Sequence, residues 1–259
     1  MFLSESKSFS KSDFKKALKN GEFIFHYQPE FELKTGKVVA VEALMRWNKP
    51  EGLVPPNLFI PALEETGFIC DMTDFLLHQT LADLQKIHAV GLPGVKMAVN
   101  LSALQFNDEN LLPLIQKNLK ESGLSPSLLE CEITENQELE LSKMKKHVFN
   151  QLSQLGIGIS IDDFGTGYSS FDLLCNLDVQ KLKLDNKFTQ NLLDNPKRRT
   201  VFSSIIQMAK DLDIAVLAEG IETSEQRDFL VKKGCLYGQG FWFCKPLPLD
   251  GLLTFLQKK

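Results

Sequence analysis

The sequence predicts an α/β fold, a (β/α)8 TIM-like barrel whose first strand is antiparallel. Three observations predict it. Eight apolar, β-branched segments alternate with helical segments, which implies a mostly parallel sheet with right-handed crossovers. The 259 residues provide room for eight such units in one closed barrel. An open doubly wound sheet is the alternative, but no glycine-rich dinucleotide fingerprint follows the first strand.

The N-terminal residues are polar and rich in serine and lysine. We therefore expect a flexible leader over residues 1–11, followed by one barrel domain over residues 12–259. Residues 12–20 fit a short helix that begins at Ser12 as its N-cap and ends at Gly21.

The first two strands are expected at residues 23–28 and 38–47. Their connection, 30–37, contains a Thr-Gly turn signal and is too short for a helical crossover. The second strand therefore returns antiparallel to the first. That direction would also explain why the acid of this strand, Glu42, lies in its middle rather than at its end.

The rest of the chain repeats strand and helix in order. Strands are apolar runs bounded by turn residues, and helices show amphipathic spacing. The expected strands are 95–100, 129–134, 157–162, 179–185, 214–219 and 235–239. The expected helices are 55–65, 71–89, 111–122, 141–155, 169–176, 199–212, 224–233 and 249–257.

Nearly every strand carries a polar side chain at or near its C-terminal end. In a parallel barrel these ends meet at one mouth of the lumen. A single acid at a strand end is commonly a solvated loop residue, but independent surface acids would not recur at the same end of successive strands. The positions are Glu42, Arg46, Asn100, Glu132, Asp162, Asp163, Lys183, Asp185, Glu219 and Gln239.

The adjacent Asp162 and Asp163 favour a metal site. Two acids at the mouth of a buried strand repel each other and resist desolvation, and a cation removes both problems. The alternative is a strand-end turn whose aspartates cap the next helix. Oxygen ligands without histidine or cysteine favour Mg²⁺ or Mn²⁺ over Zn²⁺, and such ions suit phosphoryl chemistry.

The basic residues near the predicted mouth have two interpretations. Lys183 could orient or deprotonate a water, or it could form a buried structural ion pair with Asp185. Arg46 could grip a phosphate with two hydrogen bonds. The aromatic run 241–243 is interpreted as packing rather than as a ligand platform.

Composition excludes several function classes. A net charge of −4 argues against binding to a nucleic-acid polymer. The five cysteines are widely spread and form no CxxC pair, which indicates reduced thiols rather than a disulfide framework or zinc cluster. The sequence contains no signal-peptide pattern and no long apolar run, so we expect a cytoplasmic location without membrane contact.

Taken together, the motifs resemble the EAL-domain cyclic di-GMP phosphodiesterases. Any one motif is weak, but nine in order at consistent spacing are specific, and they cover roughly residues 20–256. The motifs are VEALMRW (41–47), YQP (27–29), LFIPALEETG (58–67), VNLS (99–102), EITE (132–135), IDDFGTGYSS (161–170), KLKLD (181–185), AEGIET (218–223) and QGFWFCKPLP (239–248).

The resemblance implies roles for individual residues. Lys183 is similar to the family's water-activating lysine, Glu219 looks like a further acid of the metal site, and Glu135 looks like the acid that holds the loop 164–170. The implied ligands of two Mg²⁺ or Mn²⁺ ions are Glu42, Asn100, Glu132, Asp162 and Asp163. The implied substrate-binding residues are Gln28, Leu44, Arg46, Glu222 and Gln239.

The activity that the resemblance implies is metal-dependent hydrolysis of one phosphodiester bond of cyclic di-GMP to linear 5′-pGpG. The resemblance also implies a homodimer. A catalytically silent EAL module that binds the nucleotide or a protein is the alternative, and a barrel that acts on another phosphodiester is a third. The sequence departs from the common pattern at Glu30, Asn186 and Lys245, where apolar, arginine and arginine residues are usual. None of these changes removes an expected metal or lysine position.

Overall fold

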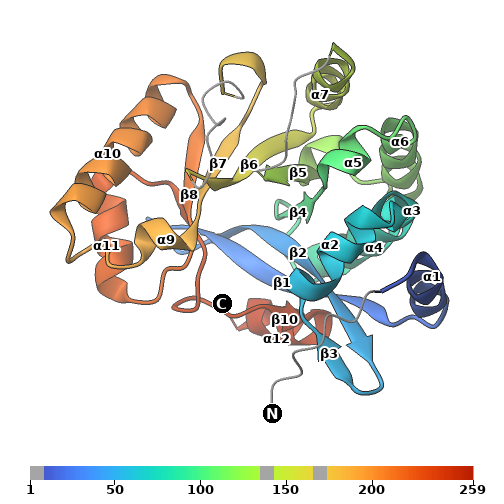
Figure 1. Ribbon diagram of the computed structural model, residues 1–259. Coiled ribbons are helices and arrows are strands. Elements are labelled where there is room, and N and C mark those ends of the chain that lie inside the picture. Colours follow the sequence, from blue (N-terminus) through green and yellow to red (C-terminus); the bar gives the residue numbers. More distant parts are fainter. Residues whose placement is uncertain (1–8, 135–142, 166–173, 259) are drawn as a thin grey trace.

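The computed structural model describes residues 9–134, 143–165 and 174–258 (Figure 1). Its sheet closes in the order β1-β9-β8-β7-β6-β5-β4-β2, and β2 pairs with β1 again. The predicted TIM-like barrel is therefore confirmed. The strands of the barrel are β1 (Phe23–Glu32), β2 (Val38–Lys49), β4 (Lys96–Asn100), β5 (Leu129–Thr134), β6 (Gly158–Phe164), β7 (Lys181–Leu184), β8 (Ala215–Ala218) and β9 (Tyr237–Gly238).

Strand β1 runs against both of its neighbours in the barrel. It is antiparallel to β2 and to β9, whereas β2 is parallel to β4. The predicted reversal of the first strand is thus confirmed, but its use to explain the position of Glu42 is wrong. Glu42 lies in the middle of β2 because β2 continues past the barrel and pairs with β3 (Gly52–Val54).

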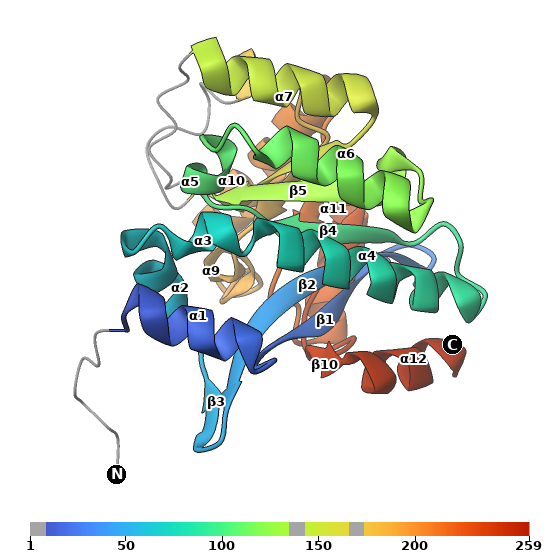
Figure 2. The same cartoon turned by 90° about the vertical axis from the view of Figure 1, so that its right-hand side faces the viewer.

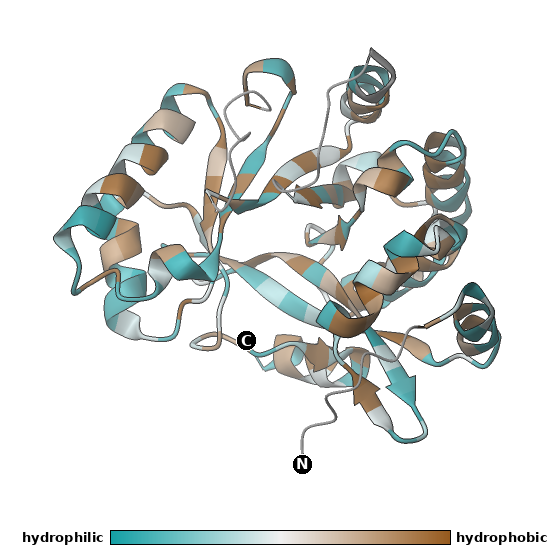
Figure 3. Cartoon of the chain, in the orientation of Figure 1, coloured by the Kyte–Doolittle hydropathy of each residue, from teal (hydrophilic) through white to brown (hydrophobic). Residues whose placement is uncertain are grey.

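Helices surround the barrel, and Figure 2 shows α4 and α6 beside each other outside the sheet. Figure 3 shows hydrophobic and hydrophilic residues on the same helices, as expected for amphipathic helices over a core. The helices are α1 (Lys11–Lys19), α2 (Pro56–Glu65), α3 (Phe68–Asp71), α4 (Thr73–Ala89), α5 (Ala103–Phe106), α6 (Leu111–Ser122), α7 (Lys143–Leu155), α9 (Asn186–Thr189), α10 (Pro196–Asp211), α11 (Ser224–Lys233) and α12 (Leu249–Gln257), with a 3₁₀ turn η1 (Pro126–Leu128).

Local differences from the predicted elements have local causes. Helix α1 begins two residues earlier than expected because Ser10, not Ser12, is its N-cap and forms a capping box with Asp13. The helix expected over 71–89 begins at Thr73 as α4, and a separate short helix that was not predicted, α3, ends just before it at Asp71. Strands β3 and β10 (Leu247–Pro248) were not predicted because each is only two or three residues long.

Two predicted segments lie partly outside the described residues. The structure describes the expected leader only from Phe9 onward, and Lys11 already belongs to α1. The helix expected over 169–176 falls mostly within 166–173, which is outside the described residues. None of the described helices combines the length and the apolar character needed to cross a bilayer.

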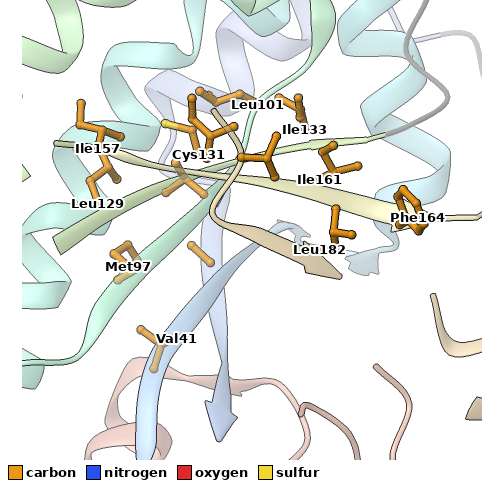
Figure 4. Packing of buried hydrophobic residues seen from close by; sticks show 14 of the residues in the cluster. Val41, Met97, Leu101, Leu129, Cys131, Ile133, Ile157, Ile161, Phe164 and Leu182 are labelled. Carbon is orange, nitrogen blue, oxygen red and sulfur yellow. The ribbon is translucent and has the colours of Figure 1, made fainter. Parts of the chain in front are cut away.

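Apolar side chains from alternate strand positions form the main core between the strands and the helices. Figure 4 shows Val41, Met97, Cys131 and Leu182 within this cluster. A smaller aromatic core joins α1, α2 and α3 to the start of β1 and the end of β2, and includes Phe14 and Trp47. Because side chains alternate across a strand, the neighbours of these core residues point into the lumen.

The lumen holds a charged layer near the N-terminal ends of β5 and β7. The ammonium of Lys181 lies 2.6 Å from Glu30 Oε2 and 2.6 Å from Glu130 Oε1, and all three side chains are buried. These contacts join β1, β5 and β7 across the barrel. The unusual acid at position 30 therefore faces a lysine and lies in the interior.

Replacing Lys181 by methionine should lower the free energy of unfolding by about 3–5 kcal/mol, because two buried carboxylates lose their cation. The double variant Glu30→Gln/Lys181→Met restores the net charge of this layer and should recover much of that loss. Urea denaturation of the wild type and these variants measures both effects. Equal stability of the single and double variants would contradict an electrostatic role for the pair.

Candidate active site

Lys183 lies at the centre of the polar cluster in the lumen. Its side chain is completely buried, and its ammonium contacts carboxylates from four other strands or strand ends. The distances from Nζ are 2.8 Å to Glu132 Oε2, 3.1 Å to Glu42 Oε2, 3.2 Å to Glu219 Oε1 and 3.5 Å to Asp162 Oδ1. One cation thus holds together acids that lie far apart in the sequence.

Amide side chains fix the carboxylate of Glu42. Asn100 Nδ2 donates to Glu42 Oε1 at 2.8 Å, and Gln239 Nε2 donates to Glu42 Oε2 at 2.9 Å. Asn100 is the last residue of β4, and Gln239 follows β9 directly. The C-terminal ends of β4, which pairs with β2, and of β9, which β1 separates from β2, therefore supply the two donors at the same mouth of the barrel.

A bulge at the end of β6 separates the two adjacent aspartates. The pairing of β6 with β7 shifts register between Ile161 and Phe164, and Asp163 adopts a left-handed φ of 54°. Asp163 N donates to Asp162 Oδ1 at 2.9 Å. Left-handed backbone is unusual for a residue other than glycine, and such strain is concentrated at functional sites.

Burial and crowding change the acidity of the cluster. Burial alone would lower the pKa of Lys183, but Asp162, Glu132 and the other carboxylates raise it well above its ordinary value. Burial raises the pKa of Glu219 to about 8, even though Lys183 opposes the shift. Burial, followed by the nearby Asp162, raises the pKa of Asp163 to about 6. The ammonium form of Lys183 is thus stabilised. With a pKa of about 8, Glu219 is mostly protonated at neutral pH, whereas Asp163, with a pKa of about 6, is mostly ionised there.

Metal binding should therefore depend on pH. Burial raises the pKa of Glu219 from 4.5 to about 8, so between these pH values the folded chain keeps a proton that the unfolded chain loses. The free energy of unfolding should therefore decrease as the pH rises from 4.5 to about 8. A divalent cation needs ionised ligands, so its affinity should increase as pH rises from about 6 to about 8. Calorimetric titration with Mn²⁺ across this range checks the prediction. A constant affinity would contradict it.

The acidic groups fit divalent cations. Oxygens of Glu42, Glu132 and Asp162 all lie within 4.8 Å of one another, and so do oxygens of Asp162, Asp163 and Glu219. Asp162 belongs to both groups, as a carboxylate shared between two neighbouring cations would. Every ligand is a hard oxygen donor, which suits Mg²⁺ or Mn²⁺.

Two pockets flank this cluster, and Leu44 lines both. The polar pocket is a cavity of about 310 Å³ that contains Gln28, Glu42, Leu44, Asp162, Glu219, Glu222 and Gln239. The apolar pocket is a cavity of about 420 Å³ that contains Leu44, Arg46, Asn100, Ile69 and Met72. Glu132 and Lys183 lie within the cluster itself, and Asp163 joins it beside Asp162 and Glu219. The other described site residues are divided between the two pockets, and Asp185 lines neither of them.

Three sequence-based interpretations need further comment. The ion pair of Lys183 with Asp185 is wrong, because Asp185 instead accepts a hydrogen bond from Lys187 N at 2.8 Å and caps α9. Phe243 stacks on Phe31, and the partly exposed Trp242 packs edge-on against Phe243 with ring centroids 4.6 Å apart, so both residues pack as predicted. Phe241 does not, because its side chain is exposed. Glu135 lies outside the described residues, as does most of the loop 164–170.

The sequence reasoning missed two residues that line the polar pocket, Asn186 and Gln190. Both lie on or next to α9, a four-residue helix that the sequence did not reveal. Their spacing of four residues was the available signal, since it places both side chains on one side of a helical turn.

The sequence matches the EAL domain family over residues 11–246. It is 38% identical to the signaling protein YkoW of Bacillus subtilis, over 93% of this chain and 30% of YkoW. It is 36% identical to the bifunctional diguanylate cyclase/cyclic di-GMP phosphodiesterase MucR of Pseudomonas aeruginosa, over 93% of this chain and 36% of MucR. The chain spans about a third of the length of these relatives.

Solved structures agree with the sequence comparison. The PaMucR phosphodiesterase in complex with c-di-GMP is similar with a TM-score of 0.87 and 36% identity, over 93% of this chain and 98% of that one. The EAL enzyme Bd1971, in its cAMP- and cyclic-di-GMP-bound form, has a TM-score of 0.90 and 34% identity, over 95% and 67% of the two chains. The family match spans most of the sequence and the folds agree, so the chain belongs to the EAL domain family.

Proposed function

We propose that the chain hydrolyses one phosphodiester bond of cyclic di-GMP to linear 5′-pGpG in a metal-dependent reaction. The observation that carries this proposal is the pair of acidic groups that share Asp162 around the buried Lys183, between two ligand-sized pockets. The names of relatives such as the cyclic di-GMP phosphodiesterase RocR, at 34% identity over 63% of its length, support the same substrate.

The proposed metal ligands are the residues whose oxygens line the cluster: Glu42, Asn100, Glu132, Asp162 and Asp163, with Glu219 beside them. Divalent cations bound there supply an activated water and charge neutralisation at the phosphate. Of the chain's own groups, Asn100 and Gln239 orient the carboxylate of Glu42 through the two amide hydrogen bonds. The oxygens of each acidic group already lie within 4.8 Å of one another, so the fold need not rearrange for them to bind one cation.

Lys183 contributes a positive charge rather than a basic site. The surrounding carboxylates favour its ammonium form, which donates hydrogen bonds and cannot accept a proton. It can thus orient a water or stabilise charge that develops on the phosphate oxygens. Of the two catalytic roles considered for this lysine, orientation is better supported than deprotonation.

The two pockets suit a ligand with two nucleoside halves. Leu44 lies between them, so a phosphodiester placed at the acids would direct one half to each side. Arg46 lines the apolar pocket, where its guanidinium donates to Met45 O at 2.9 Å and remains near the path of the ligand. We propose that Gln28, Glu222 and Gln239 contact the half in the polar pocket.

A catalytically silent module is the second candidate. Lys183 contacts four carboxylates of the cluster and so neutralises part of their charge. A module that binds no metal would need such a positive charge to keep these acids together. Incubation of the purified protein with cyclic di-GMP and Mg²⁺ or Mn²⁺, followed by chromatography of pGpG, separates the candidates. Turnover supports the enzyme, whereas binding in Ca²⁺ without turnover in Mg²⁺ or Mn²⁺ supports the silent module. The homodimer and the cytoplasmic location remain predictions.

A further inference from the structure

We propose that the lumen binds one alkali metal cation, Na⁺ or K⁺, in the charged layer beneath the candidate active site. Its ligands are the carboxylates of Glu30 and Glu132 and the hydroxyl of Ser160, with Glu130 beside them. This site is separate from the two acidic groups proposed for divalent cations and shares only Glu132 with them. It does not depend on the hydrolysis of cyclic di-GMP.

Three buried carboxylates lie close enough together to contact one cation. Oxygens of Glu30, Glu130 and Glu132 all lie within 4.8 Å of one another. They come from β1 and β5, two strands that do not pair with each other. None of the three residues is more than 4% exposed, so water does not screen their mutual repulsion. The layer therefore requires positive charge to be stable.

The lysines of the lumen supply only part of that charge. The ammonium of Lys181 contacts both Glu30 and Glu130, at 2.6 Å each. Glu132 depends on Lys183, whose ammonium is shared with three further carboxylates of the upper cluster. Carboxylates thus outnumber ammonium groups in the lumen, and the layer around Glu30 keeps a net negative charge.

Three oxygens of this layer, apart from those that contact Lys181, have no hydrogen-bond partner within the described part of the chain. They are Glu30 Oε1, Glu132 Oε1 and Ser160 Oγ, and Ser160 is fully buried. Ile159 and Ile161 pack into the outer core, so alternation along β6 directs the hydroxyl of Ser160 into the lumen. Ser160 also lies in register with Glu132. Unpaired buried acceptors are costly, and one cation would satisfy all three.

Short side chains leave room for an ion in this layer. Glu30 pairs in register with Ala40 of β2, and Glu130 pairs in register with Ala98 of β4. Bulky branched side chains usually fill such layers of a barrel, whereas these alanines fill little of the lumen. Because an apolar residue is usual at position 30 in the family, we expect the site in this chain and not in relatives that keep the usual residue.

A monovalent metal cation fits this layer better than a proton or a divalent ion. A proton shared between two carboxylates joins only two oxygens, which would leave the third without a partner. Mg²⁺ usually keeps several waters and Ca²⁺ takes six to eight ligands, more than this closed layer offers. The hydration energy lost on burial also increases with the square of the charge, so a monovalent ion loses far less.

Urea denaturation of the protein freed of divalent ions tests the proposal in KCl, NaCl and choline chloride at equal ionic strength. Relative to choline, at least one alkali cation should raise the midpoint of the wild type, by roughly 0.5 M urea at ten times its Kd. Glu30→Gln and Ser160→Ala should each lose most of this shift. Asp163→Asn, in the acidic group that does not include Glu132, is the matched control and should keep it.

Three results would overturn the proposal. Equal midpoints of the wild type in the three salts would show that a proton, and not a metal cation, neutralises the layer. An alkali shift that Glu30→Gln retains would place the ion among the upper acids, and so would a shift that Asp163→Asn loses. The measurements use neither substrate nor divalent ion. A protein that shows the alkali shift but hydrolyses no cyclic di-GMP would therefore remove the proposed function and leave this site.

Discussion

Replacing Glu42 by alanine should weaken Mn²⁺ binding by more than about a hundredfold. Loss of a residue that only hydrogen-bonds to a metal ligand costs about ten- to a hundredfold, and Glu42 is proposed as a ligand itself. Turnover of cyclic di-GMP should disappear. Contacts with Lys183, Asn100 and Gln239 hold the carboxylate of Glu42 in one position. We expect no other carboxylate to replace it as a metal ligand in the alanine variant. Because the variant removes one of several crowded acids, its unfolding should remain cooperative.

Calorimetric titration with Mn²⁺ and the cyclic di-GMP assay measure both effects. Glu64→Ala is the matched control, since Glu64 is a partly buried carboxylate in the apolar pocket, outside the acidic groups. It should keep the Mn²⁺ affinity of the wild type. Undiminished turnover in the Glu42 variant would rule out our assignment of the metal site.

Replacing Lys183 by methionine should lower the free energy of unfolding without metal by about 3–5 kcal/mol. The change leaves buried carboxylates from several strands without their shared cation. Mn²⁺ should then restore stability, because a ligand that binds only the folded chain shifts the equilibrium towards it. Turnover should fall even in saturating metal, since the ammonium is lost.

Urea denaturation with and without Mn²⁺ checks this result. Lys187→Met removes an exposed lysine of α9 and should change neither the stability nor its response to metal. A Lys183 variant as stable as the wild type without metal would show that the carboxylates do not depend on this ammonium. Normal turnover in the variant would remove its proposed catalytic role.

The barrel and the convergence of its acids could be predicted because both follow from local patterns. Alternating strand and helix segments imply parallel strands, and parallel strands bring their C-terminal ends together. Glu42, Glu132 and Asp162 therefore meet although 90 residues separate the first two and 30 residues separate the last two. The alternation of side chains along a strand likewise predicted that Lys183 points into the lumen.

The remaining features depend on contacts that no local pattern encodes. The bulge that turns Asp163 arises from the register between β6 and β7, and Asp185 caps a helix of four residues instead of pairing with Lys183. The exposure of Phe241 depends on how the segment after β9 crosses the rim. Hydrophobic character alone predicts burial for that residue, and here it is wrong.

The reversal of β1 has a consequence for the side of the barrel that receives α1. Phe23, where β1 begins, pairs with Trp47 near the end of β2, so α1 and its aromatic core lie beside the pocketed face. Ile69 and Met72 belong both to that core and to the wall of the apolar pocket. Any effect that docking of α1 has on ligand affinity in this pocket must therefore be matched by an equal effect of the ligand on the docking of α1.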